Sequence, residues 1–131
     1  TVPFQIDNAV EASQPVLDRY RHVWTPDLRV LDTDGTELYR WNGYLPPAEF
    51  APQLIAAVAQ ARLRRKEYDK AKALNEEVVR RFPTALVAAE AQYYLGVSGY
   101  RATHNQSDLL HAWHDLEKSH PQSEWTVKQN F

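Results

Sequence analysis

The chain has 131 residues, enough for one ordinary domain or two small halves that share a core. Hydrophobic residues make up 44% of it and charged residues 24%, which is typical of a folded globular protein. A net charge of −2 gives no basic surface for nucleic acid, and no apolar run approaches the roughly 18 residues that span a bilayer. We therefore expect a folded protein with no nucleic-acid partner and no membrane insertion.

The sequence contains no cysteine. This absence excludes, within this chain, disulfides, thiolate nucleophiles, cysteine-ligated zinc and dithiol redox chemistry. The compartment stays unknown. The stretch "TVPFQIDNAV" lacks the basic start and apolar core of a signal peptide, which slightly favours the cytoplasm, and a removed signal peptide remains an open alternative.

The first third of the chain carries β-type patterns. "VPFQID" (2–7) is short and mostly apolar and predicts a strand. "SQPVLDRYR" (13–21) predicts a helix, with Ser13 as its N-cap and Pro15 in its first turn. The segments 27–32 and 37–41 predict two strands joined at Asp34-Gly35, a strong hairpin signal.

Helical periodicity takes over near residue 45. We expect a first helix after Pro46, with Pro52 tolerated in its first turn, and its apolar stripe comprises Phe50, Leu54, Ile55, Val58 and Ala59. Further helices are expected over 67–82, 85–102 and 107–120, and a short one capped by Ser123. Small residues at Ala59, Ala71 and Gly96 suit helix crossings, and Trp113 is expected to pack against residues 93–97.

The helical part repeats weakly. "EEVVRRFPTA" (76–85) and "HDLEKSHPQS" (114–123) share a polar-apolar helix end, an aromatic ring, a proline and a small residue. The first helix pair resembles a tetratricopeptide repeat, with Tyr68, Ala71 and Pro83 at repeat-like positions, whereas Asn75 departs from the usual aromatic. The resemblance implies stacked helical hairpins over 64–131.

Residues 1–63 resemble the C-terminal part of a thioredoxin-like domain. The matching stretches are "VPFQID", "VLDRYRHVWTP" and "LRVLDTDGTELYRWNGYLPPAEF", with the helix that follows. The resemblance implies a cis-proline loop at Thr25-Pro26, two antiparallel strands and a closing helix. The expected fold is therefore α/β followed by all-α: a partial thioredoxin-like sheet with flanking helices, continued by tetratricopeptide-like helical hairpins.

The Cys-x-x-Cys half of that family is not in this sequence. The chain is then a fragment, a divergent protein without the redox half, or a subunit whose partner supplies the missing strand. We expect a non-catalytic interaction or assembly module in which a protein partner or a second copy covers an open sheet edge. The candidate interaction surface comprises Val2, Phe4, Ile6, Trp24 and Tyr44. The alternative is a fragment of a thiol-disulfide oxidoreductase or redox-linked chaperone whose cysteines lie further upstream.

Other chemistry is weakly signalled. Two histidines and two carboxylates could suggest a metal site, and they are Asp108, His111, His114 and Asp115. Trp113 marks the opposite face of the same helix as buried, so we expect the histidines to be exposed to solvent. The acidic residues near Asp34 suit a hairpin turn better than a calcium loop. The aromatic residues Tyr39, Trp41, Tyr44 and Phe50 are expected to cover the junction of sheet and helix rather than bind a ligand. We therefore predict no catalytic, cofactor or metal residue.

The purified chain should not turn over a model disulfide in a dithiol-dependent assay. The reaction needs a thiolate nucleophile, and this sequence supplies none. Measurable reductase or isomerase turnover above a boiled control would contradict this expectation.

Overall fold

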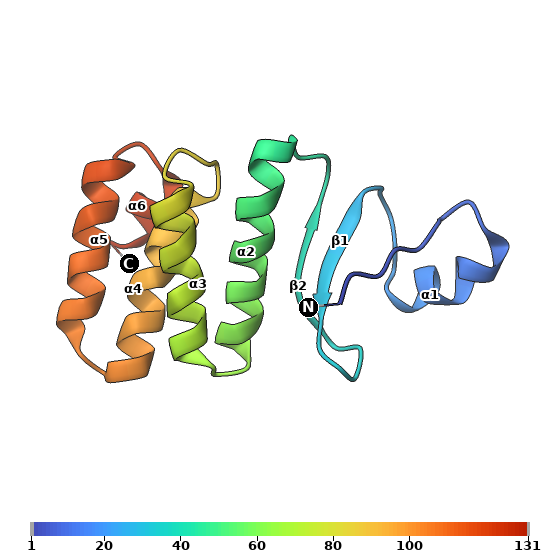
Figure 1. Cartoon of the computed structure of the whole chain (residues 1–131), viewed down its shortest axis with the longest axis horizontal. Coiled ribbons are helices and arrows are strands. Elements are labelled where there is room, and N and C mark those ends of the chain that lie inside the picture. Colours follow the sequence, from blue (N-terminus) through green and yellow to red (C-terminus); the bar gives the residue numbers. More distant parts are fainter. Residues whose placement is uncertain (1, 131) are drawn as a thin grey trace.

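The computed structural model describes residues 2–130. Along the chain the elements are a 3-10 turn (Glu11–Ser13), α1 (Gln14–Arg19), β1 (Asp27–Leu31), β2 (Glu37–Asn42), α2 (Pro47–Arg64), α3 (Tyr68–Arg81), α4 (Ala88–Thr103), α5 (Gln106–Ser119) and α6 (Glu124–Lys128). They form successive layers, with α1 on one side of a small sheet and α2, α3 and the remaining helices on the other (Figure 1). The expected mixed α/β, mostly helical fold is confirmed.

The sheet has two antiparallel strands, with Leu28 opposite Trp41 and Val30 opposite Tyr39. The turn is the expected one, since Gly35 has a left-handed φ of +86° and the Asp34 carboxylate accepts a hydrogen bond from the Thr36 N–H. An irregularity follows Val30, where Leu31 pairs with Glu37 and β2 accommodates one extra residue.

The strand expected over residues 2–7 is wrong. This segment has no strand structure, and most of its side chains are exposed, Val2 at 91% and Phe4 at 86%. A strand requires a neighbouring backbone to pair with, and within residues 2–130 only β1 and β2 pair. The sheet therefore has two strands.

Helix α1 forms where the sequence indicated, with a proline in its first turn, but the Ser13 side chain does not cap it. The helix ends in a left-handed residue, Arg21, with φ of 50°. The hydrogen bonds from Arg21 N to Asp18 O and from His22 N to Leu17 O close this end as a Schellman motif. The hydroxyl of Tyr20 donates to Gly35 O at 2.9 Å and ties α1 to the hairpin turn.

Helix α2 departs from the single apolar stripe that the sequence indicated. Phe50 and Leu54 are 38% and 37% exposed, whereas Gln60 is buried. Pro52 is buried too and lies beyond the first turn, because the helix begins at Pro47. The reason is that α2 contacts the sheet on one side and α3 on the other, so two of its faces are covered.

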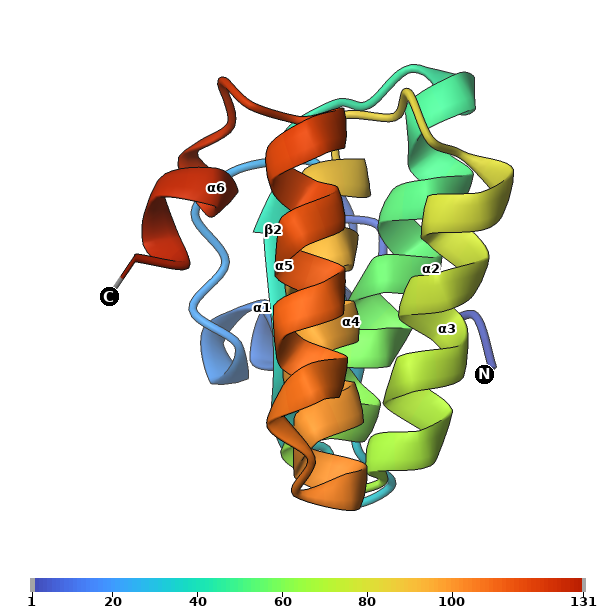
Figure 2. The ribbon, with the colours of Figure 1, turned by 90° about the vertical axis from the view of Figure 1, so that its left-hand side faces the viewer.

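Helices α3, α4 and α5 match the expected spans to within three residues at each end, and Ser123 caps α6 by accepting from Trp125 N. They pack consecutively, and α6 lies against α4 and α5 (Figure 2). The small residues expected at helix crossings are buried there, with Ala59 and Ala71 both at 0% exposure. A Cβ on Gly96 would lie 3.1 Å from Ala112 Cβ, so a larger residue would push α4 and α5 apart.

Trp113 packs where the sequence indicated. Its ring stacks on Tyr93 with centroids 5.1 Å apart, and its indole N–H donates to Tyr93 O at 3.2 Å. Trp125 of α6 joins the same cluster at 5.3 Å from Tyr93. The tryptophan is half-buried and fastens α5, α4 and α6 together.

Replacing Trp113 with alanine should lower the free energy of unfolding by about 3 kcal/mol, the lower end of the range for a large buried aromatic, because the ring is only half-buried. Urea unfolding followed by circular dichroism measures the loss. The control is Leu110→Ala on the same helix, where the side chain is 63% exposed and the change should be within about 0.5 kcal/mol. Equal effects of the two substitutions would contradict the anchoring role.

Candidate interaction surface at the Pro26 loop

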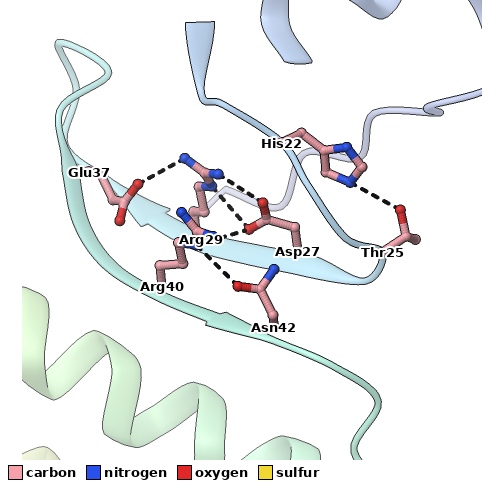
Figure 3. Close-up of polar contacts among 7 residues, drawn as sticks. All are labelled: His22, Thr25, Asp27, Arg29, Glu37, Arg40 and Asn42. Atoms are coloured by element: carbon pink, nitrogen blue, oxygen red, sulfur yellow. Dashed lines mark hydrogen bonds and ion pairs between the residues drawn. The ribbon is translucent and has the colours of Figure 1, made fainter. Parts of the chain in front are cut away.

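The loop before β1 is held by two side chains and by one backbone hydrogen bond. The Thr25-Pro26 peptide bond is cis, as expected from the sequence. The Thr25 hydroxyl accepts from Asn8 Nδ2 at 2.9 Å and lies 3.0 Å from His22 Nε2 (Figure 3). On the other side of the loop, Gly43 N donates to Pro26 O at 3.0 Å. The loop is thus fixed both to the N-terminal segment and to the end of β2.

Four of the five candidate surface residues are exposed, and two of them flank this loop in the chain. Trp24 is 68% exposed and Tyr44 is 77% exposed, on either side of the Pro26–Gly43 hydrogen bond. Val2 and Phe4 are exposed on the N-terminal segment, and Ile6 is half-buried. The expectation that Tyr44 covers the sheet-to-helix junction is wrong, because only Tyr39, Trp41 and Phe50 cluster there, with neighbouring centroids 6.3 Å apart.

The outer edge of β1 carries unpaired backbone groups. Pro26 O accepts from Gly43 N, and Asp32 N donates to Thr36 O, so these two residues bond toward β2. In an antiparallel ladder the direction of bonding alternates along the strand. The N–H and C=O groups of Asp27, Arg29 and Leu31 therefore point away from β2, and within residues 2–130 no other backbone segment bonds to them.

The sheet face opposite α2 carries an ion-pair cluster. Arg29 binds Asp27 at 2.8 Å and Glu37 at 2.9 Å, and its side chain is only 11% exposed (Figure 3). Arg40 lies opposite Arg29 on β2, 3.9 Å from Asp27 Oδ1. Like charges opposite each other destabilise a sheet, so the two carboxylates are what allow these arginines to lie side by side.

The charges in this cluster stabilise one another. The hydrogen bond from Arg29 holds the pKa of Asp27 below its usual value of 3.8, and burial opposes that shift only in part. The same hydrogen bond raises the pKa of Arg29. With side-chain exposures of 6% and 11%, this pair is screened less by solvent than an exposed salt bridge, so removing one partner would leave the other charge poorly solvated.

Sequence reasoning missed this cluster. The alternation of charged and apolar residues along β1 could have predicted it, because Asp27 and Arg29 are two positions apart and therefore share one face of the strand. The pairing of Arg29 with Glu37 depends on the bulge in β2, which the sequence does not predict.

The other candidate residues do not assemble into a site. His111 and His114 are exposed on α5, and residues 2–130 contain no group of three metal-ligating side chains. Across the same residues, no helix is both long and apolar enough to cross a membrane. Neither a family model nor a curated protein matches this sequence.

The lowered pKa of Asp27 makes stability depend on pH. A carboxyl with a lower pKa in the folded state contributes stability above its unfolded value near 3.8 and loses it as the pH falls through the folded value. Asp27→Asn should therefore be less stable than the wild type at pH 7, by about 1–3 kcal/mol. This difference should close below pH 3.8, which chemical denaturation across pH would measure. Asp115→Asn, exposed on α5, serves as the control and should show no such gap.

Proposed function

We propose that this chain is a non-catalytic assembly module that pairs through the open edge of β1. The supporting observation is the row of unpaired backbone groups on Asp27, Arg29 and Leu31, which begins shortly after the exposed ring of Trp24 in the chain. An open strand edge is a template for another strand, and proteins bind extended segments in this way. Isolated two-stranded hairpins are marginally stable, so an added strand would also stabilise the sheet.

A second copy of β1 is the occupant that this edge fits best. The outward-facing groups lie symmetrically about Arg29, so an antiparallel copy pairs Asp27 with Leu31 of the other chain and Arg29 with its own counterpart. Each outward N–H and C=O then finds a partner. The two arginines that meet are each already bound by Asp27 and Glu37, which offsets their repulsion.

The alternative function would also use the outer edge of β1. The order of a proline loop, two antiparallel strands and a helix packed on one face supports a thioredoxin-like arrangement. In a thiol-disulfide oxidoreductase or redox-linked chaperone of that kind, a strand encoded upstream would lie beside β1 and lead to the cysteine pair. The gene sequence preceding Thr1 discriminates the two functions, because a Cys-x-x-Cys within roughly 40 to 60 codons favours the redox protein.

Self-assembly is tested by placing a charge on the edge. Leu31 is 42% exposed at the outer edge of β1, and Leu31→Lys should prevent strand pairing while leaving the hairpin intact. In sedimentation velocity at about 10–100 μM, the wild type should form dimers and the variant should be monomeric. Leu110→Lys on α5, where the side chain is 63% exposed, is the matched control and should remain dimeric.

A wild type that stays monomeric over this range would contradict self-pairing of β1. Hydrogen exchange adds an independent check, because the Asp27, Arg29 and Leu31 amides should exchange slowly in the dimer and rapidly in Leu31→Lys.

A further inference from the structure

The C-terminal end of α1 and the polar face of the sheet line a shallow, open hollow of about 330 Å³. Arginines from two separate parts of the sequence line it, namely Arg19, Arg21, Arg29 and Arg40, together with Tyr20, Gly35 and Glu37. The hollow lies on the polar face of the sheet, distinct from the backbone edge of β1 described above.

Tyr20 gathers two of these guanidinium groups. Its hydroxyl is anchored on Gly35 O, and its ring centroid lies 5.3 Å from the Arg19 guanidinium carbon and 5.4 Å from that of Arg29. Cation–ring contacts of this kind stabilise the positions of both groups. Gly35 leaves room for this arrangement, because a Cβ there would lie 2.6 Å from Arg19 Nη2.

The carboxylates nearby do not neutralise the arginines fully. Asp27 and Glu37 are both bound to Arg29, and Arg40 reaches Asp27 only at 3.9 Å. The hydrogen bond from Thr36 is the main cause of the lowered pKa of Asp34, and the Arg19 guanidinium adds a smaller contribution. Within residues 2–130, however, neither Arg19 nor Arg21 forms an ion pair. The hollow is left with an excess of positive charge.

We infer that this hollow is a binding site for the phosphate group of a small phosphate monoester. Guanidinium groups donate hydrogen bonds in a planar fork that matches phosphate oxygens, and a tetrahedral dianion can accept from several forks at once. Arg19, Arg21 and Arg40 supply these donors, whereas Arg29 is already bound by two carboxylates. The volume lies at the small end of ligand pockets, so it accommodates a phosphate with a compact organic group.

Arg21 offers a substitution that separates binding from folding. It occupies the left-handed position of the α1 Schellman motif, where glycine is the usual residue. Arg21→Gly removes a guanidinium group and also relieves an unfavourable backbone conformation. Its stability should therefore match or exceed that of the wild type, so that weaker binding could not be attributed to unfolding.

The test titrates the full chain with phenyl phosphate, with inorganic phosphate and with acetate at constant ionic strength, followed by isothermal calorimetry and by amide NMR shifts. We expect saturable binding of both phosphates, with shifts centred on Arg19, Arg21 and Gly35, and at least about tenfold weaker binding of acetate. Arg19→Gln and Arg21→Gly should each weaken phosphate binding about tenfold or more. Arg80→Gln, on the exposed face of α3, should leave it unchanged.

The proposal is overturned if the wild type shows no saturable phosphate binding, if acetate binds as well, or if Arg80→Gln loses affinity equally. It is also overturned if a single-stranded oligonucleotide binds this hollow more tightly than phenyl phosphate does, since the site would then serve nucleic acid. Strand pairing at β1 is tested separately by the Leu31→Lys variant.

Discussion

The structure depends on helix α2 being covered on two sides. A two-stranded hairpin cannot maintain itself in water, and it is ordered here because Tyr39 and Trp41 pack toward α2, with Phe50 at the contact. The opposite side of α2 starts the helical stack by packing on α3. Small side chains at Ala57 and Ala59 allow this close double contact, since both are fully buried. Loss of α2 would separate the sheet from its support.

The two ends of the molecule are stabilised by different means. The helical end has an apolar core, including Val78 and Leu116 at 0% exposure, and a ring cluster around Trp113. Over residues 2–46, the end with the sheet has no buried residue and relies on charge pairs and on hydrogen bonds such as that from Tyr20 to Gly35. An end held by so few apolar contacts has little stability of its own, which is why pairing with another strand would contribute so much to it.

Our two proposals use different groups of the sheet, namely the backbone groups of β1 in one and the charged side chains in the other. The outward backbone groups of β1 offer a strand edge, whereas the arginines beside it offer a phosphate site on one face. Asp27 and Glu37 serve both, because they neutralise Arg29 next to the edge and leave Arg19, Arg21 and Arg40 as the donors of the hollow. An anion bound there would reduce the repulsion among the arginines and so stabilise the weaker end of the chain.

The sequence by itself determined the elements whose patterns are local. Asp34-Gly35 specified the hairpin because its turn requires a left-handed glycine, and the helices from Tyr68 onward followed from periodicity and proline stops. It also placed Trp113 against residue 93, because one helical face carried the large side chains. The turn and the helix spans depend on neighbours within a few residues, which a sequence displays directly.

Only the tertiary structure decided the features that depend on distant partners. Residues 2–7 have a strand-like composition yet form no strand, because a strand exists only where another backbone pairs with it. The apolar stripe of α2 was misplaced because the helix is covered from two directions, and a single period cannot show that. The arginines of the hollow come from the end of α1 and from both strands. Strand pairing places Arg29 opposite Arg40, and the Tyr20–Gly35 contact brings the end of α1 beside them. Such convergence depends on the path of the chain in space, which local spacing does not encode.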